Sequence, residues 1–215
     1  MSEINYYVLD VETTGLSTKV HEITEFSIVR FSDKVNLFKN VKCDRPEQAS
    51  LQALQITNKT QFDLRQGMSK LEACDIIEKF LNEDNLNPDF RCIVGHNIQF
   101  DRKFLFAMFD ECKKSFPANL WLDTIDMSRQ IFKANNLQTK GKLKLADACN
   151  SLGVKLINGA HQAKVDSRNT YMLWKKIKDT NFNFLPHIKT VKHKQENIDY
   201  TDSEINDLLD EINDN

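Results

Sequence analysis

The sequence predicts an α/β domain in which helices cover a mixed sheet. Short apolar, β-favouring runs come first in the chain, and amphipathic segments of helical period then alternate with a further run of this kind. Hydrophobic residues make up 40% and charged residues 28% of the 215 positions, which is an ordinary globular composition. This composition excludes a disordered chain, a collagen and a disulfide miniprotein. The sequence contains no run of 18 apolar residues, the length that a transmembrane helix needs.

Four runs are predicted to be strands. The first is Tyr6 to Val11, an apolar stretch that ends at a Thr-Thr-Gly turn. Two further runs, His21 to Phe31 and Lys34 to Cys43, are separated only by Ser32-Asp33, which predicts a tight hairpin. Cys92 to Gly95 is the fourth run.

Six segments are predicted to be helical. Leu51 to Ile56 is a short helix or turn, and Ser69 with Glu72 forms a capping box that opens the first long helix. The inward residues of this helix are Leu71, Cys74, Ile77, Phe80 and Leu81, and those of the next are Leu105, Met108, Phe109 and Cys112. A further helix is predicted over Thr124 to Asn135. The next covers Leu143 to Leu152 and is closed by Gly153. The last covers Val165 to Lys178, with Met172, Leu173 and Ile177 inward.

The cysteines and the first residues indicate the compartment. The five cysteines are widely spaced and contain no C-x-x-C pair, so we expect reduced core thiols rather than disulfides or a zinc site. Residues 1–5 lack the basic start and apolar stretch of a secretory signal. We therefore expect a cytoplasmic protein, with the nucleus as the alternative.

Charge divides the chain unevenly. All 29 Lys and Arg lie at or before Lys194, and eight of the 31 acids follow it, so residues 1–194 carry a formal charge of +6 and residues 195–215 carry −8. A mildly basic body suits a polyanionic ligand. We expect one domain over residues 1–180 and a C-terminal extension over 181–215 that ends in an acidic, flexible or helical tail.

Asp10 and Glu12 are the first candidate metal ligands. Alternate residues of a strand project from the same face, so both carboxylates should lie together at the end of the first strand. Such a pair repels unless a cation lies between, and oxygen ligands favour Mg²⁺ or Mn²⁺ over zinc. Acidic pairs of this spacing are common in a chain with 31 acids, so the pair alone favours a metal site and an ordinary strand end equally.

Asp101, His161 and Asp166 are the next candidates. Asp101 stands where the fourth strand leads into a helix, and a helix N-cap is the alternative role for it. His161 lies in a loop and Asp166 in the first turn of the last helix, and a histidine beside bound metals could take a proton from an attacking water. His96 and Asp101 are also five residues apart, so spacing alone does not say which histidine is structural.

Together these segments resemble the three motifs of the DEDDh 3′→5′ exonucleases, the family of the proofreading epsilon subunit and of the exonuclease domain of Gram-positive replicative polymerases. The matching stretches are Asp10 to Leu16, Gly95-His96-Asn97 leading into Phe100-Asp101, and His161 with Asp166. The resemblance covers Tyr6 to Ile177 and is far more specific than any single motif. It implies a ribonuclease-H-like fold with a five-stranded mixed sheet, helices on both sides, and the site at one edge of the sheet.

The resemblance also implies a two-metal mechanism. Two divalent cations, Mg²⁺ or Mn²⁺, would be held by four carboxylates: Asp10 would bridge both ions, Glu12 and Asp166 would complete the first, and Asp101 would hold the second. His161 would be the general base that deprotonates the attacking water. These five residues are the expected catalytic set.

Substrate contacts are implied at five further positions, namely Thr13, Leu16, His96, Asn97 and Phe100. Leu16 would wedge against the last base, although a leucine after a turn glycine is as often simply core. Phe100 and Asn97 would line the wall of the pocket, with plain core as the alternative for Phe100. We assign His96 to structure or substrate contact rather than to the role of base.

The expected function is hydrolysis of terminal phosphodiesters of single-stranded or frayed DNA from the 3′ end, releasing nucleoside 5′-monophosphates, in proofreading, replication or repair. An exoribonuclease or oligoribonuclease-like enzyme acting on RNA is the alternative. A non-catalytic module that binds nucleic-acid ends or a replication partner is the second alternative, but a pure binder has no need for a cluster of like charges.

Two basic or amphipathic segments could contact partners. Lys140, Lys142 and Lys144 form a candidate loop for backbone phosphates, although a solvated loop is the commoner outcome for such a run. In the tail, Ile205, Leu208, Leu209 and Ile212 recur at helical spacing. This stripe could be a helix that binds a DNA polymerase or another replication protein, a lid on the basic body, or a frayed terminus.

Overall fold

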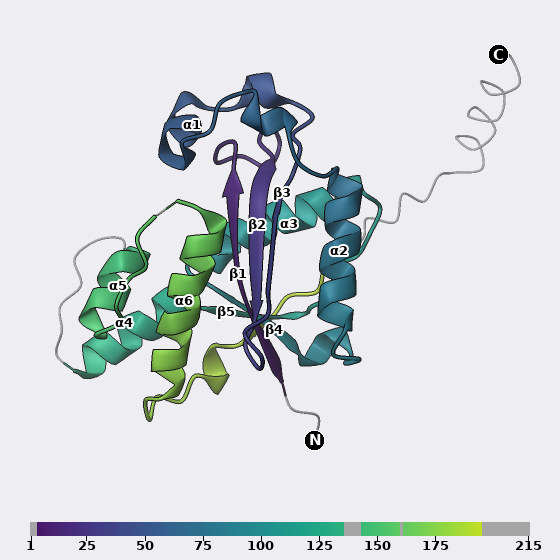
Figure 1. The fold of residues 1–215 in the computed structure, drawn as a ribbon. Helices are drawn as coiled ribbons and strands as arrows, with labels where there is room; N and C mark the ends of the chain where they lie inside the picture. The colour runs from purple at the N-terminus through teal and green to yellow at the C-terminus, as the bar shows by residue number, and fades with distance from the viewer. Residues whose placement is uncertain (1–3, 136–142, 160, 195–215) are drawn as a thin grey trace, which may run out of the picture.

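A six-stranded mixed sheet forms the centre of the computed structural model, which describes residues 4–135, 143–159 and 161–194 (Figure 1). The strands are β1 (Asn5–Thr13), β2 (Ile23–Arg30), β3 (Asn36–Asn40), β4 (Arg91–Gly95), β5 (Leu120–Asp123) and β6 (Lys189–Thr190), in the spatial order β3-β2-β1-β4-β5-β6. Strands β1, β4 and β5 are parallel, and β2, β3 and β6 pair antiparallel to their neighbours. The α/β prediction is confirmed, with six strands where five were expected.

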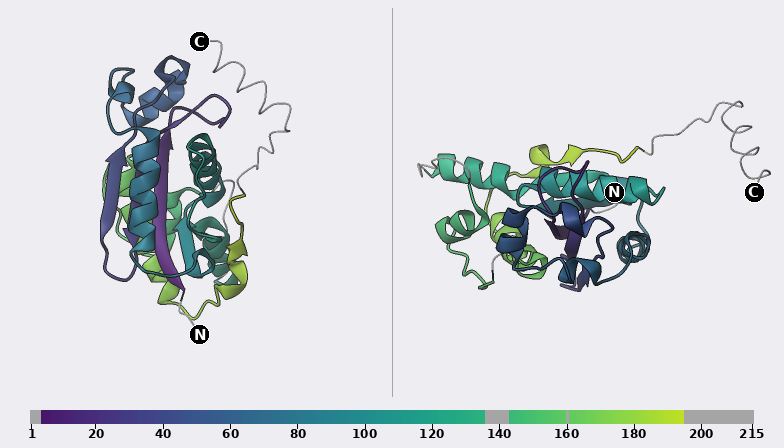
Figure 2. Two further views of the ribbon diagram at one scale, coloured as in Figure 1. Left: turned by 90° about the vertical axis from the view of Figure 1, so that its right-hand side faces the viewer. Right: turned by 90° about the horizontal axis from the view of Figure 1, so that it is seen from above.

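Helices cover both faces of this sheet (Figure 2). Helices α2 (Lys70–Asn82) and α3 (Ile98–Glu111) pack on one face, and α4 (Thr124–Ala134), α5 (Leu145–Ser151) and α6 (Ala163–Lys178) pack on the other. Helix α1 (Leu51–Thr57) lies beyond the carboxyl end of β1 (Figure 1). Four single-turn 3₁₀ helices complete the set: Pro46–Gln48, Asp63–Arg65, Pro88–Phe90 and Leu185–His187.

The alternation of β1 places its acids on the α6 face. Tyr7, Leu9 and Val11 join the core beneath α2 and α3, whereas Val8 joins the core beneath α4 to α6. Because residues of one strand alternate, Asp10 and Glu12 share the face of Val8. The strand continues through Glu12 to Thr13, where a register shift in the pairing with β2 marks a β-bulge.

The helices begin and end close to where the sequence predicts them. The capping box of Ser69 and Glu72 is present at the start of α2, and Gly153 follows α5 with a left-handed φ of 70°. Leu71 and Met172 were expected to face inward, and this is wrong: they are 51% and 42% exposed and lie off the buried sides of their helices.

The connection between β2 and β3 differs from the predicted two-residue hairpin. Residues 31–35 separate the strands, Lys34 adopts a left-handed φ of 65°, and the Arg30 N–H donates to the Val35 carbonyl at 2.9 Å. The strands are therefore shorter, and the turn longer, than the apolar runs indicated.

The strands β5 and β6 were not predicted. Trp121 of β5 is fully buried, and its indole Nε1–H donates to the Val191 carbonyl at 3.0 Å. The His193 ring stacks on Phe106 with the centroids 4.3 Å apart, and its Nδ1 accepts the Phe116 N–H. The first part of the expected C-terminal extension thus packs on the sheet, whereas the acidic tail lies outside the described residues. The division at residue 180 stays a prediction.

All five cysteines are free thiols, and four of them are buried, as expected of core cysteines. In the described part of the chain, no helix combines the length and the apolar character needed to cross a membrane.

Candidate active site

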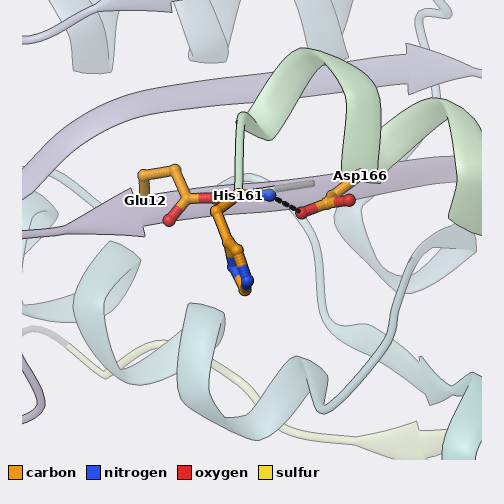
Figure 3. Close-up of side chains that lie close together, drawn as sticks. All are labelled: Glu12, His161 and Asp166. Atoms are coloured by element: carbon orange, nitrogen blue, oxygen red, sulfur yellow. Dashed lines mark hydrogen bonds between the residues drawn. The ribbon is translucent and has the colours of Figure 1, made fainter. Parts of the chain in front are cut away.

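The structure brings the five expected catalytic residues to one end of the sheet. Asp10 and Glu12 lie at the end of β1, Asp101 in the first turn of α3, and Asp166 in the first turn of α6, with His161 just ahead of that helix. One ligand atom from each of Glu12, His161 and Asp166 lies within 4.8 Å of the other two (Figure 3). The charges of Asp101, Glu12 and Asp166 all act on the Asp10 carboxylate.

Backbone hydrogen bonds fix two of these carboxylates. Asp101 Oδ1 accepts the Val11 N–H at 3.0 Å. This bond connects the start of α3 to β1 at the residue between Asp10 and Glu12. Asp166 Oδ2 accepts the His161 N–H at 2.8 Å, with His161 in a left-handed conformation at φ 63° (Figure 3). The N-cap position of α3 belongs to Asn97, so the alternative role of Asp101 as the N-cap is wrong.

The carboxylates are held in a setting that disfavours their charge. Burial, together with the charges of Asp101 and Glu12, holds the pKa of Asp10 well above its usual value. Burial and the charges of Asp166 and Glu25 raise the pKa of Glu12 to about 8. Burial raises the pKa of Asp101 to about 7 although it accepts the Val11 N–H, and burial also raises the pKa of Asp166.

These residues fit a divalent metal. Four carboxylates that converge in a half-buried position repel one another, and each raised pKa reports a cost that a bound cation would remove. Carboxylate oxygens are the ligands that Mg²⁺ and Mn²⁺ prefer. Asp10, Glu12, Asp101 and Asp166 are the residues that would hold such ions.

The two histidines have different environments. The His96 Nε2 is 3.0 Å from the Leu143 carbonyl and its Nδ1 is 2.8 Å from the Thr124 hydroxyl. Since a carbonyl only accepts, Nε2 carries a proton, and both ring nitrogens have partners within the fold. Burial lowers the pKa of His96, which favours the neutral form of the ring. His161, by contrast, is exposed and lies beside Glu12 and Asp166. The assignment of His96 to structure or substrate contact stays a prediction.

An apolar pocket of about 180 Å³ adjoins Glu12. Thr13, Leu16 and Phe100 line it together with residues of α1. Leu16 is 82% exposed, so the alternative that it is core is wrong. Gly15 explains this exposure in part: a side chain there would meet the His21 ring at 2.5 Å, so only glycine allows the tight loop that presents Leu16.

A second, polar cleft of about 490 Å³ lies on the other side of Leu16 and Phe100. Asn97 lines this cleft rather than the apolar pocket, as do Lys19 and Lys103. Of the three lysines in the predicted basic loop, Lys144 is exposed and the other two lie outside the described residues.

Sequence reasoning missed two acids near this site, the half-buried Asp123 and the buried Glu25. Asp123 Oδ1 accepts the N–H groups of Asn97 and Ile125, and so holds the loop before α3 against the start of α4. Glu25 of β2 is 5% exposed and pairs with Glu12 across the sheet. The available signal was an acid in the middle of an otherwise apolar run, which burial would require to be paired.

A separate acidic group does not fit a metal. Glu22, Asp44 and Glu111 offer carboxylate oxygens that lie close together. The ammonium of Lys70 already contacts all three carboxylates, at 2.6 Å from Glu22 and 2.9 Å from Asp44. This cluster therefore joins α2 and α3 to the loops beside β2 and is structural.

The fold and the site together define a ribonuclease-H-like protein with an acidic cluster at the carboxyl end of its central strand. The chain belongs to the exonuclease family, whose sequence model (RNase_T) matches residues 7–174. This confirms the resemblance drawn from the motifs.

Relatives and solved structures agree with this assignment. The chain is 27% identical over 177 residues to a PolC-type DNA polymerase III of Halalkalibacterium halodurans, and equally to the 3′-5′ exonuclease DinG of Staphylococcus saprophyticus. These matches cover 81% and 80% of this chain but only 11% and 18% of the relatives. Two solved structures share the fold. Cell-death related nuclease 4 matches with a TM-score of 0.70 and 13% identity, over 82% of this chain and 64% of that one. E. coli exonuclease I in complex with a dA16 oligonucleotide matches with a TM-score of 0.67 and 16% identity, over 83% of this chain and 41% of that one.

Proposed function

We propose that this chain is a metal-dependent 3′→5′ exonuclease that removes terminal nucleotides from single-stranded or frayed DNA. The observation that carries the proposal is the convergence of Asp10, Glu12, Asp101 and Asp166 with the exposed His161, beside an apolar pocket of about 180 Å³. Two divalent cations, Mg²⁺ or Mn²⁺, would be held by the four carboxylates and would stabilise the charge on the attacking and leaving oxygens of the displacement at phosphorus.

His161 is the general base in this proposal. Its imidazole accepts a proton from the attacking water, whose oxygen forms the new bond to phosphorus. The bond that breaks joins this phosphorus to the 3′ oxygen of the preceding nucleotide, which leaves with the electron pair and is then protonated. The product is a nucleoside 5′-monophosphate. Asp166 accepts the backbone N–H of His161 at 2.8 Å and so orients the base.

The apolar pocket and the polar cleft would bind different parts of the substrate, on either side of the ridge formed by Leu16 and Phe100. The base of the last nucleotide occupies the apolar pocket, where Leu16 wedges against it and Thr13 lies beside its sugar. The strand then crosses the ridge into the polar cleft with Asn97, Lys19 and Lys103. Among the described residues, neither lysine side chain has a hydrogen-bond or ion-pair partner; the one contact of Lys19 with Arg45 is through its backbone carbonyl, so both ammonium groups can meet backbone phosphates.

DNA is the proposed substrate because the PolC-type relatives are DNA polymerases by name. For the same reason we propose that the chain works alongside a DNA polymerase or another replication protein, through the C-terminal tail. The free thiols suit a reducing, cytoplasmic location.

The test uses 5′-end-labelled single-stranded DNA and RNA of matched sequence, with Mg²⁺, Mn²⁺ or EDTA. We expect a ladder of shortened DNA, faster than for RNA, that EDTA abolishes and that a blocked 3′ end prevents. Asp10→Asn should abolish turnover, whereas Asp147→Asn, an exposed acid in the first turn of α5, should leave it unchanged. Preferential RNA cleavage would replace DNA by RNA as substrate, and end binding without cleavage would refute an enzyme.

A further inference from the structure

Glu25 is a buried acid on the active-site face whose two carboxylate oxygens are both engaged. Its Oε1 accepts the Ala163 N–H at 2.7 Å, and its Oε2 contacts the Lys59 ammonium at 2.6 Å. Only 5% of the residue is exposed, and it stands opposite Glu12 in the pairing of β1 with β2. Glu25 therefore lies beside the metal-site carboxylates, with each of its two oxygens already bonded to a group of the protein.

The two partners of Glu25 come from segments that form the site. Ala163 is the first residue of α6, two residues after His161 and three before Asp166. Lys59 follows α1, whose residues Ile56 and Thr57 line the apolar pocket. The Glu25 side chain of β2 thus connects two segments to the sheet beside Glu12: the segment that carries His161 and the segment next to the apolar pocket.

Among the described residues, Glu25 is the one group that accepts the Ala163 N–H. The first N–H groups of a helix lack partners in their own helix, and no side chain of the N-cap residue Gln162 bonds the start of α6. Ala163 is fully buried, so with the Glu25 side chain in place its N–H is shielded from solvent. Loss of this oxygen would leave the N–H unpaired and free the first turn of α6 to move.

We propose that Glu25 is a positioning residue that holds the first turn of α6, and with it His161 and Asp166, in place against Glu12. This inference rests on the proposed nuclease function. Displacements of about 1 Å in a catalytic group cost about 10²-fold in rate, so loss of Glu25 should act on kcat. The terminal-nucleotide pocket contains no α6 residue, so KM should change little.

Three substitutions separate the two bonds. Glu25→Ala removes both bonds. Glu25→Gln keeps an oxygen for the Ala163 N–H but loses the charge beside Lys59. Lys59→Met removes only the ion pair. The matched control is Glu22→Ala, because Glu22 is also buried and also pairs with a lysine, but its partners are Lys70 and the loop amides of Asp44 and Arg45.

The experiment measures kcat, KM and thermal unfolding for each variant, and hydrogen exchange of the Ala163 amide by NMR without metal. We expect Glu25→Ala to lower kcat about 10²-fold with KM changed less than about threefold, and to speed exchange of the Ala163 amide. Glu25→Gln should keep kcat within about tenfold of wild type and Lys59→Met within about threefold, and Glu22→Ala should lower the melting temperature without this loss of kcat.

Three results would overturn the proposal. The first is an unchanged kcat in Glu25→Ala. The second is a Glu25→Gln variant as inactive as Glu25→Ala, which would make the charge, rather than the bond to Ala163, the important property. The third is an equal loss of kcat in Glu22→Ala, which would indicate general destabilisation. An inactive wild-type chain would refute the nuclease function separately, and the Ala163 exchange rate would still show whether Glu25 holds α6.

Discussion

Replacing Glu12 by Gln should stabilise the metal-free protein near neutral pH although it damages the proposed active site. Burial and the neighbouring acids raise the pKa of Glu12 from 4.5 to about 8 in the folded chain. A carboxyl whose folded pKa is raised stabilises the fold fully below its unfolded pKa, and this stability is lost as the pH rises from about 4.5 to about 8. Glutamine has the same shape and never carries the charge.

The magnitude follows from the pH interval. Between the unfolded pKa of 4.5 and a working pH of about 7.5, three pH units at about 1.4 kcal/mol each give a ceiling of about 4 kcal/mol. Relaxation around the charge reduces this, so we expect about 1–3 kcal/mol. For a chain of this length each kcal/mol shifts the melting temperature by about 2–4 °C, which gives a rise of about 2–12 °C.

The assay is thermal unfolding in EDTA at about pH 5 and pH 7.5, followed by titration with Mn²⁺. Glu12→Gln should melt above wild type at the higher pH and close to it at the lower pH, and Mn²⁺ should stabilise wild type more than the variant. The control is Glu47→Gln, which removes an exposed charge and should change little at either pH. A Glu12→Gln variant that melts below wild type at pH 7.5, or equally at both pH values, would refute the electrostatic reasoning.

Further predictions concern the histidines and the substrate path. His161→Ala should lower the single-turnover rate by about 10²–10⁴ with little change in melting temperature. His96→Ala removes the ring that contacts the Leu143 carbonyl and the Thr124 hydroxyl, and although this hydroxyl keeps the Gly95 carbonyl as a partner, the change should cost about 1–3 kcal/mol of stability in denaturant unfolding and less than about tenfold in rate. The opposite pattern would exchange the roles of the two histidines. Replacing both Lys19 and Lys103 by Met should raise KM for a long single strand about tenfold and reduce its salt dependence, while a dinucleotide is cleaved as before; equal effects on both substrates would remove the cleft from the strand path. Leu16→Ala should leave thermal stability unchanged, because the side chain is 82% exposed, but raise KM for the dinucleotide; an unchanged KM would refute the wedge.

The sequence predicted those parts of the fold that rest on local patterns. The alternation in β1 correctly placed Asp10 and Glu12 on one face, and the capping box correctly marked the start of α2. Strand β5 has four residues, too few for a period to show, and β6 has two residues that are held only by pairing with β5 and by the Trp121 bond to Val191. Such strands exist because of tertiary contacts, which a local pattern does not contain.

The sequence identified the residues of the candidate site, but it did not predict the burial and hydrogen-bond partners of each residue. The motifs named the carboxylates and His161, while spacing left His96 as an equal candidate until the structure showed both of its ring nitrogens bonded within the fold. Glu25 was missed because its importance comes from cross-strand register with Glu12 and from a contact with Ala163, 138 residues away. The tail stripe stays a prediction, since it lies outside the described residues.

The most direct test of the account counts bound metal. Electron paramagnetic resonance of Mn²⁺, titrated in the presence of a nucleoside 5′-monophosphate, should show two ions per wild-type chain, and Asp10→Asn should lose them while its circular dichroism and melting curve stay those of a folded protein. Wild-type chain that binds no Mn²⁺, or binds it equally well after Asp10→Asn, would contradict a metal site built from Asp10, Glu12, Asp101 and Asp166.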